Sequence, residues 1–410
     1  MANLNQTGES KKSSKAHSRR QGTITNTPNA HDKNVYRIRY TLPSESQKNG
    51  KQKRVTETVR GTKTYAQTTL NKRLAQLEAK RHVDKSKETV AAYIQDWLEN
   101  HIADDNITLR TAQGYRGYID RYIIPGIGSI RLQDLEPLDI KKVYKDMKGR
   151  GLSNTTVVQA HRILRKALND AVQSDPPLLP TNPADSKTAQ PPAKRKYQVE
   201  VWDVPTIHKF LKLSKGTRFG YVYEFALSTG MRRSEIAGLK WEAVDLPDGD
   251  DEKGRLNVVS TLQRITGHGL VESAPKTDGS RRPVTLSSPV VNLLREVRLT
   301  QQLSKMEFGP LWQDTGFVFT HPNGTPLIPD QITQDFASLV KRFGLPHLTF
   351  HGLGHAYATL ALRQGIQPKV VSKAMGHSTI GITMDLYQHV LDEMQDDLAD
   401  AISNVLNGAD

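Results

Sequence analysis

The chain of 410 residues contains no cysteine, and this absence removes several classes of protein from consideration. Disulfide frameworks, cysteine-based zinc sites and thiol nucleophiles are all excluded. The chain also lacks any run of about 18 uncharged apolar residues, the length that a membrane-spanning helix needs. No apolar segment follows the charges at the N-terminus, so a secretory signal is not expected there. We therefore expect a cytoplasmic protein that has no membrane partner.

Acidic residues are scarce in the first fifth of the chain. Residues 1–85 contain 19 Lys and Arg against 6 Asp and Glu, so they carry nearly all of the net charge of +14. Such a local excess is typical of contact with a phosphate backbone or an anionic membrane surface, and also of a solvated basic tail. Residues 1–32 show no apolar period, and we expect them to form a disordered basic tail.

A small α+β module is predicted over residues 33–84. Val35 to Thr41 and Arg54 to Arg60 alternate between apolar and polar residues, as strands do, with an Asn-Gly turn between them. A helix is expected over Thr68 to His82. This could be a generic α+β mini-domain, but basic strand faces suit a DNA groove. The candidate DNA contacts here are Arg37, Arg39, Lys51 and Arg54.

An all-α bundle is predicted over residues 86–176. Apolar residues recur at helical spacing in four segments, and Thr108 and Ser153 are suited to cap two of them. We expect a chain break at Pro125 to Gly128. Arg110 and Arg162 are candidate phosphate contacts. Residues 177–196 are rich in proline and predict a linker, whose basic end could follow a DNA backbone through Lys194, Arg195 and Lys196.

Residues 197–390 predict a mainly helical domain with a small antiparallel sheet. Leu256 to Gln263 and Arg281 to Leu286 read as its strands. The final segment, 391–410, has an apolar stripe opposite an acidic face and predicts an amphipathic helix. Such a helix either belongs to the core of its own domain or docks on a neighbouring molecule.

The chemistry of the chain is concentrated between Thr349 and Val390. Two imidazoles, His351 and His377, could hold an anion, and the phenol of Tyr387 follows. A phenol has a pKa near ~10 and is a poor nucleophile unless cations stabilise the charge that develops on its target. Suitable cations are Arg232 at a helix start and Lys276 at the mouth of a hairpin. Zinc binding by His351 and His355 is the rival interpretation, but no acidic residue lies between them.

Together these strings resemble the tyrosine recombinase family, which includes the integrases of phages and conjugative transposons. The matching strings are Thr229-Gly-Met-Arg-Arg-Ser-Glu235, Pro275-Lys-Thr277 with Arg281-Arg282, His351-Gly-Leu-Gly-His355, Met375-Gly-His-Ser378 and Thr383 to Tyr387-Gln-His389. The resemblance implies an arm-binding domain, a helical core-binding domain and a catalytic domain. It also implies that residues 391–410 dock in trans.

By the same resemblance, the chain should cleave and rejoin DNA through a 3′-phosphotyrosyl intermediate, without metal or another cofactor. Tyr387 would be the nucleophile, Arg232 a clamp on the phosphate and Lys276 the general acid. His351 would act in proton transfer and His377 would bind the phosphate, with Arg281 as a further DNA contact. The implied partners are double-stranded attachment sites of core and arm type, three further copies in a tetramer, and DNA-bending accessory proteins. The implied location is the bacterial nucleoid.

Gly354 departs from the family pattern, which places a second phosphate-clamping arginine at this position. Glycine brings neither charge nor donor, so we expect a catalytically impaired recombinase. One alternative is a non-cleaving DNA-binding or assembly protein built on a recombinase scaffold. A type IB topoisomerase shares the chemistry, but a separate arm-binding module implies the pairing of sites.

Overall fold

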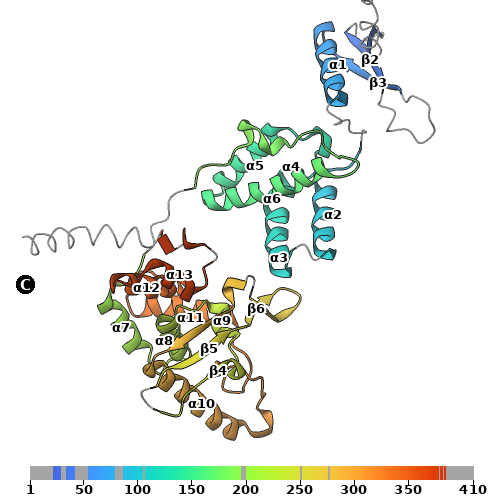
Figure 1. The fold of residues 1–410 in the computed structure, drawn as a ribbon. Helices are drawn as coiled ribbons and strands as arrows, with labels where there is room; N and C mark the ends of the chain where they lie inside the picture. The colour runs from blue at the N-terminus through green and yellow to red at the C-terminus, as the bar shows by residue number, and fades with distance from the viewer. Residues whose placement is uncertain are drawn as a thin grey trace, which may run out of the picture. The chain divides into compact units, whose positions relative to one another are not determined.

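The computed structural model divides the chain into two compact units, Met1–Arg195 and Lys196–Asp410 (Figure 1), and each is described by itself. The structure describes residues 22–28, 34–41, 54–78, 86–104, 107–194, 200–249, 252–275, 278–377, 379–381 and 383–384. Within these residues no helix is long and apolar enough to cross a membrane.

The first unit opens with a three-stranded antiparallel sheet in the order β1-β2-β3, formed by Thr23–Asn26, Val35–Thr41 and Arg54–Arg60. The helix α1, Lys63–Glu78, lies against one face of it. Alternation along β2 and β3 turns every second side chain toward this helix. The resulting small core consists of Ile38, Tyr40, Val59, Ala66 and Leu70.

Two predictions for this region are corrected by the structure. The expected disorder over residues 1–32 is wrong for β1, where only Ile24 turns inward, so the segment has too few apolar residues to signal a strand. It is held by backbone pairing along β2. The helix predicted from Thr68 begins at Lys63, because Thr62 accepts a hydrogen bond from the Tyr65 backbone N–H and opens the first turn. Residues 79–82 of that prediction lie outside the described residues.

The rest of the first unit is a helical bundle, as the periodicity predicts. Thr89, Thr108 and Ser153 each accept a backbone hydrogen bond that caps the helix following them. The chain does not break at Pro125, because a π-helical turn joins α3 to a further helical turn that contains the proline and ends at Gly128. The helical segments are α2 (Val90–Ala103), α3 (Leu109–Tyr118), the π turn (Ile119–Ile123), α4 (Ile124–Ile127), α5 (Pro137–Gly149) and α6 (Asn154–Gln173).

The linker predicted over residues 177–196 is wrong for its first two thirds. Leu179, Ala184 and Ala189 are buried in the core of the bundle, and two short 3₁₀ turns, Pro183–Asp185 and Lys187–Ala189, lie between them. Asn182 fastens this segment to α6, since its side-chain amide donates to the Arg165 carbonyl over 2.9 Å. Proline fixes a conformation without deciding whether the segment packs, so composition alone could not separate the two cases.

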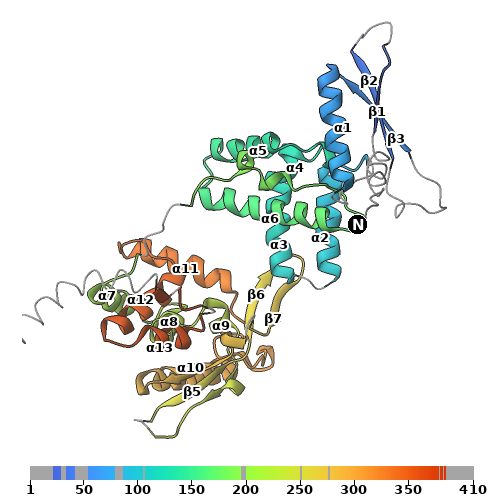
Figure 2. The same ribbon diagram turned by 45° about the horizontal axis from the view of Figure 1, so that its top comes forward.

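The second unit is mainly helical, with seven α-helices among its described residues. Its core joins apolar side chains of α8, α10, α11 and α12 with those of a small sheet. Figures 1 and 2 show these helices around that sheet. The helices are α7 (Val204–Ser214), α8 (Gly220–Thr229), α9 (Arg233–Ala237), α10 (Ser288–Phe308), α11 (Pro329–Arg342), α12 (Phe350–Arg363) and α13 (Pro368–Met375).

The strands of this unit are all antiparallel and form two sheets. One has the order β4-β5-β8, and the other is the hairpin β6–β7, which projects from the rest of the unit in Figures 1 and 2. The single strand predicted over 256–263 is divided, because Val258 pairs with Arg282 whereas Thr261 pairs with Ser273. The strands are β4 (Val244–Asp245), β5 (Gly254–Val258), β6 (Thr261–Ile265), β7 (Gly269–Ser273) and β8 (Arg282–Leu286). The amphipathic segment 391–410 lies outside the described residues.

The packing of residues 178–189 can be tested with Leu179→Ala. Leu179 is 4% exposed, and deleting a buried leucine side chain typically costs about 2–5 kcal/mol. We expect hydrogen exchange of the α6 amides to accelerate accordingly. The exposed Lys187→Ala is the control, and equal exchange rates in the two variants would mean that the segment is dispensable for the bundle.

Candidate functional site

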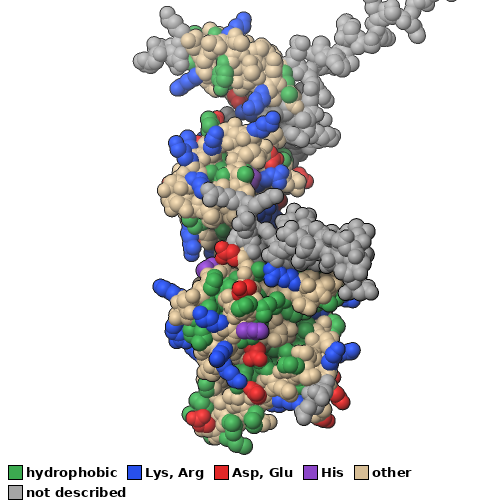
Figure 3. Space-filling model, turned by 90° about the vertical axis from the view of Figure 1, so that its left-hand side faces the viewer, with side chains coloured by type: hydrophobic (Ala, Val, Ile, Leu, Met, Phe, Trp, Pro, Cys, Tyr) green, Lys and Arg blue, Asp and Glu red, His purple; other side chains and the backbone are tan. Residues whose placement is uncertain are grey.

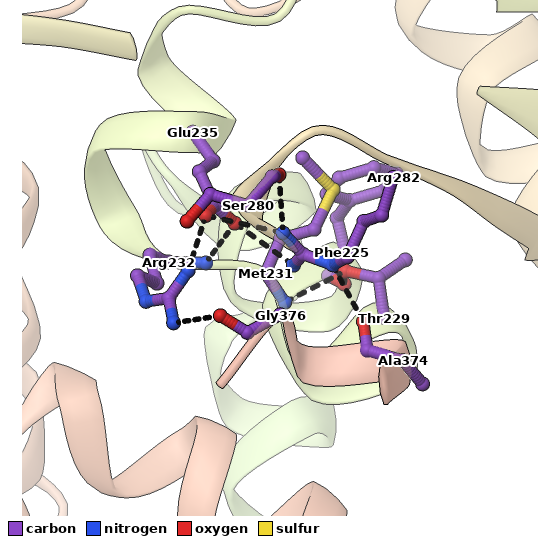
Figure 4. A network of polar contacts seen from close by, with 9 residues as sticks. All are labelled: Phe225, Thr229, Met231, Arg232, Glu235, Ser280, Arg282, Ala374 and Gly376. Atoms are coloured by element: carbon purple, nitrogen blue, oxygen red, sulfur yellow. Dashed lines mark hydrogen bonds and ion pairs between the residues drawn. The ribbon is translucent and has the colours of Figure 1, made fainter. Parts of the chain in front are cut away.

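A buried carboxylate, Glu235, organises the candidate site (Figure 4). Gly230 ends α8 with a left-handed backbone, and Arg232 stands as the N-cap of α9 two residues later. The backbone N–H of Arg232 donates to Glu235 Oε2 over 3.0 Å, and its guanidinium Nη1 donates to Oε1 over 2.7 Å. The Glu235 side chain is 2% exposed whereas that of Arg232 is 34% exposed, so this arginine remains accessible to a ligand.

A second arginine, Arg282, shares the same carboxylate. Its Nη1 and Nη2 donate to the two oxygens of Glu235 over 3.2 and 3.0 Å, and its Nε donates to the carbonyl of Ala374 at the end of α13 over 2.6 Å. Arg232 reaches the same corner, since its Nη2 donates to the Gly376 carbonyl over 2.7 Å. Segments 92 and 144 residues apart in the chain are thereby joined in one network.

Two glycines permit this close packing. Gly376 has φ of 64°, and a Cβ there would lie 2.8 Å from Arg282 Nη1. Gly230 also has φ of 64°, and a Cβ there would lie 2.5 Å from the ring of Tyr357. A side chain at either position would be strained and would displace the arginine network or the aromatic ring beneath it.

Three histidines lie beside the arginines. His351 stands in the first turn of α12, which Thr349 caps, and the His355 ring follows one turn later with its centroid 4.6 Å from that of His351. His377 comes directly after the turn at Gly376, and its Nδ1 is 2.8 Å from the hydroxyl of the buried Thr383. The His355 Nδ1 atom is buried and has no hydrogen-bond partner within the described part of the chain.

Their environment keeps these imidazoles neutral. Burial lowers the pKa of His377 to about 4, and the nearby charges of Arg232, His351 and Arg282 add to the effect while Glu235 opposes it. Burial also lowers the pKa of His355 to about 4, with help from His351 and His377. The pKa of His351 is lowered by desolvation first and then by Arg232, although its side chain is exposed to solvent. Arg232 is thus close enough to influence both His351 and His377, and its hydrogen bond to the Gly376 carbonyl places it beside His377.

Gly354 lies on the same helix, α12, and faces this region. A Cβ at this position would be 3.5 Å from Met375 Cε and 3.8 Å from the Gly230 carbonyl, both ordinary contacts, so the backbone admits a larger side chain. Arg363 does not stand in for an arginine at position 354, because it lies near Asp203 at the N-cap of α7. The pKa of Asp203 is lowered first by its hydrogen bonds with Thr206 and only last by Arg363.

Of the six residues that the sequence predicts for the catalytic site, the structure brings together Arg232, His351, Gly354 and His377. Lys276 and Tyr387 lie outside the described residues. Arg282 and Thr383 stand in the matching strings, but the sequence analysis assigned neither of them a role in the site. Alternation along β8 could have indicated Arg282, because it falls on the inward face with Val284 and Leu286. No group of three His, Asp or Glu side chains that could hold a metal ion occurs in the described ranges.

The predicted DNA contacts are spread over both units. Arg37, Arg39 and Arg54 are exposed on the N-terminal sheet, and Arg110, Arg162, Lys194 and Arg281 are exposed elsewhere. Arg110 donates to Gln113 on its own helix. Lys51, Arg195 and Lys196 are not among the described residues. On the face drawn in Figure 3, Lys and Arg side chains (blue) are scattered and form no single patch, so charge alone does not mark a groove there.

The N-terminal sheet has an exposed face that is rich in arginine and threonine. Its exposed side chains form two cross-strand rows, Thr23–Arg39–Thr56 and Thr25–Arg37–Thr58, and the alternate side chains are turned toward α1. The buried acid Glu57 on that inner side accepts a hydrogen bond from Tyr40 and pairs with Arg73. Among the described residues of these three strands, the outer face therefore presents cations and short hydroxyl side chains and no carboxylate.

The lowered histidine pKa values predict that the protein loses stability in mild acid. His355 and His377 take up protons near pH 6.5 when unfolded but only near pH 4 when folded, so the unfolded chain binds more protons between these values. Stability should fall as pH drops through this window, and His355→Gln should reduce the loss between pH 7 and pH 5 by about 1 kcal/mol, after allowance for partial exposure. Urea unfolding at the two pH values measures this, with the exposed His208→Gln as control. An unaltered loss in His355→Gln would contradict the prediction.

Comparison with known proteins assigns the chain to a family. A model of the phage integrase family matches residues 199–394, and a model of the N-terminal SAM-like domain of phage integrases matches residues 89–148. The Tyrosine recombinase XerC-like protein of Caldanaerobacter subterraneus subsp. tengcongensis is 27% identical over 306 residues, which make up 71% of this chain and 76% of that protein.

Two solved structures share the fold. The Tn1549 transposon integrase in complex with transposon right end DNA has a TM-score of 0.62 at 23% identity, over 74% of this chain and 98% of that one. A lambda integrase tetramer bound to a Holliday junction has a TM-score of 0.52 at 17% identity, over 88% of this chain and 96% of that one. With one family match in the helical bundle and another across the arginine–histidine site, this chain belongs to the phage integrase family of tyrosine recombinases.

Proposed function

We propose that the chain is a site-specific DNA recombinase that cleaves and rejoins strands through a 3′-phosphotyrosyl intermediate. The observation that carries the proposal is the convergence of Arg232, His351 and His377 on one space beside the buried Glu235. Two neutral imidazoles and an accessible guanidinium are donors and acceptors suited to a phosphodiester.

The proposed reaction exchanges one phosphodiester bond for another. The phenol oxygen of Tyr387 bonds to phosphorus while the bond from phosphorus to the 5′-oxygen breaks, so no energy source is required. His351 accepts the phenol proton, a role open to it because its pKa is lowered and the ring is neutral at pH 7. Lys276 gives a proton to the departing 5′-oxygen.

Arg232 and His377 hold the phosphate in this scheme. Arg232 offers its solvent-facing N–H groups to the non-bridging oxygens. When the Thr383 hydroxyl donates to His377 Nδ1, the proton of this neutral ring lies on Nε2 and can be donated to a phosphate oxygen. Fixed donors of this kind stabilise the negative charge that grows in the transition state.

We propose further that cleavage is attenuated by Gly354. Removing one donor from a preorganised anion site typically costs about 10²–10³ in rate. The same residue favours the second candidate function, a DNA-binding or assembly protein that does not cleave. A covalent adduct between Tyr387 and DNA distinguishes the two, because only the recombinase forms it.

The proposed partners are double-stranded attachment sites of core and arm type, together with copies of the chain in a tetramer. Structures of relatives support this, since the Tn1549 integrase is in complex with transposon DNA and the lambda integrase forms a tetramer on a Holliday junction. DNA-bending accessory proteins, trans docking of residues 391–410 and a place at the bacterial nucleoid belong to the same proposal.

The attenuation is tested by Gly354→Arg. The open backbone position and the ordinary Cβ contacts predict a folded variant, in which a second guanidinium faces the phosphate. On a nicked suicide substrate, we expect the covalent complex to form about 10²–10³ times faster than with the parent chain.

Gly354→Gln is the matched control, because it adds a side chain of similar length without charge. Equal rates for the parent and the Gly354→Arg chain would disprove the attenuation. Equal gains from Arg and Gln would show that helix stability and not charge is responsible.

We also propose that the threonine–arginine face of the N-terminal sheet reads the arm-type site. Residues two apart on a strand lie about 6.7 Å apart, which is close to two base steps of about 3.4 Å. A β-ribbon fits the major groove, where arginine binds guanine O6 and N7. Arg37 and Arg39 would therefore read guanines two base pairs apart, and the flanking threonines would contact neighbouring bases or phosphates.

This reading is tested by selecting binding sites from randomised duplexes. Arg39→Ala should lose its preference at one base position and bind the selected site about 1–3 kcal/mol more weakly. Arg54→Ala, at the edge of the sheet, is the control and should weaken all sequences equally. A uniform loss with Arg39→Ala as well would mean that the face binds only the backbone.

A further inference from the structure

Arg282 is a buried cation whose hydrogen bonds are all directed inward. Its side chain is 5% exposed, and its three guanidinium nitrogens donate to Glu235, to the carbonyl of Ala374 and to the carbonyl of Ser280 (Figure 4). Taking a guanidinium out of water costs several kcal/mol unless a carboxylate and further acceptors compensate. Such a residue cannot reach DNA itself, so any effect on the reaction must act through its neighbours.

Two of these neighbours belong to the site. Glu235 Oε1 accepts hydrogen bonds from both Arg282 Nη1 and Arg232 Nη1, so the two guanidiniums share one carboxylate. The Ala374 carbonyl lies three residues before His377, and the Gly376 carbonyl between them receives Arg232. Arg282 therefore fixes the carboxylate on one side of Arg232 and the end of α13 on the other.

We propose that Arg282 is a positioning residue that holds the side chains of Arg232 and His377 where both can contact the phosphate. The proposal rests on the proposed function. If Arg282 were removed, both oxygens of Glu235 would be free to bind Arg232 and would draw its guanidinium toward the protein interior. The turn after α13 would lose the hydrogen bond that fixes its last carbonyls, and His377 would move with it.

The charges around His377 provide a readout that does not depend on cleavage. Arg232, Arg282 and His351 face this imidazole together with the carboxylate of Glu235, and His355 lies near enough to be influenced by it. Removing the cation at position 282 leaves Glu235 less compensated. The loss of a nearby cation and the less compensated carboxylate both favour the protonated ring, so the pKa of His377 should rise.

The experiment compares Arg282→Gln and Arg282→Lys in the parent chain and in the Gly354→Arg background. Arg295→Gln is the matched control, because this half-buried arginine of the same unit binds the carbonyls of Pro247 and Gly249 away from the site. The measurements are the His377 titration by NMR with labelled histidine, the rate of covalent complex formation on a suicide substrate, the affinity for core-site DNA, and thermal unfolding.

We expect Arg282→Gln to raise the His377 pKa and to slow cleavage at least ten-fold in the Gly354→Arg background, with DNA affinity within two-fold. The His377 pKa and the cleavage rate of Arg282→Lys should lie between those of Arg282→Gln and the parent, because an ammonium keeps the charge but cannot bridge Glu235 and Ala374 in the same way. Arg295→Gln should change neither the His377 pKa nor the cleavage rate.

An unshifted His377 titration together with undiminished cleavage in folded Arg282→Gln would overturn the proposal. If that variant does not fold, Arg282→Lys decides, and values equal to the parent would overturn it. Failure of the proposed function has a different signature: no covalent complex in any variant, Gly354→Arg included, while the His377 pKa still responds to position 282.

Discussion

The site depends on one carboxylate that has been removed from water. Glu235 is 2% exposed, and an uncompensated charge there would be strongly destabilising. Compensation comes from two guanidiniums that belong to different elements, Arg232 at the start of α9 and Arg282 at the start of β8. Because the carboxylate needs both, the helix and the strand are held in one arrangement, and the surplus positive charge is left facing outward. The accessible guanidinium of Arg232 is thus held in place by the requirement to neutralise a buried acid.

Burial is the main reason why the pKa values of His377 and His355 are lowered to about 4. The charges of Arg232, His351 and Arg282 lower the pKa of His377 further, and those of His351 and His377 lower that of His355. A neutral ring can accept a proton or donate one hydrogen bond, as attack on a phosphodiester requires. Gly354 stands on the same helix in ordinary contact with its neighbours, so the backbone there accommodates glycine and would also admit a larger side chain.

Local signals in the sequence were reliable where the physics is local. Thr108 and Ser153 cap helices as expected, and alternation located β2 and β3 to the residue. Predictions were wrong where contacts with distant segments determine the local structure. β1 exists because β2 offers it an edge, the strand predicted over 256–263 is divided between two sheets, and the proline-rich segment packs because the bundle has room for Leu179 and Ala184.

The sequence by itself determined the family and the candidate groups, because the strings around Arg232, His351 and His377 resemble those of integrases and Gly354 departs from that pattern. Tertiary structure alone decided how those groups are held. Arg282 is buried, shares the carboxylate of Glu235 with Arg232 and anchors the end of α13. Its contacts with Glu235 and with Ala374 join segments 47 and 92 residues apart. No periodicity in the chain encodes such contacts, since they arise only when the desolvation of one charge is offset by another that folding brings to it.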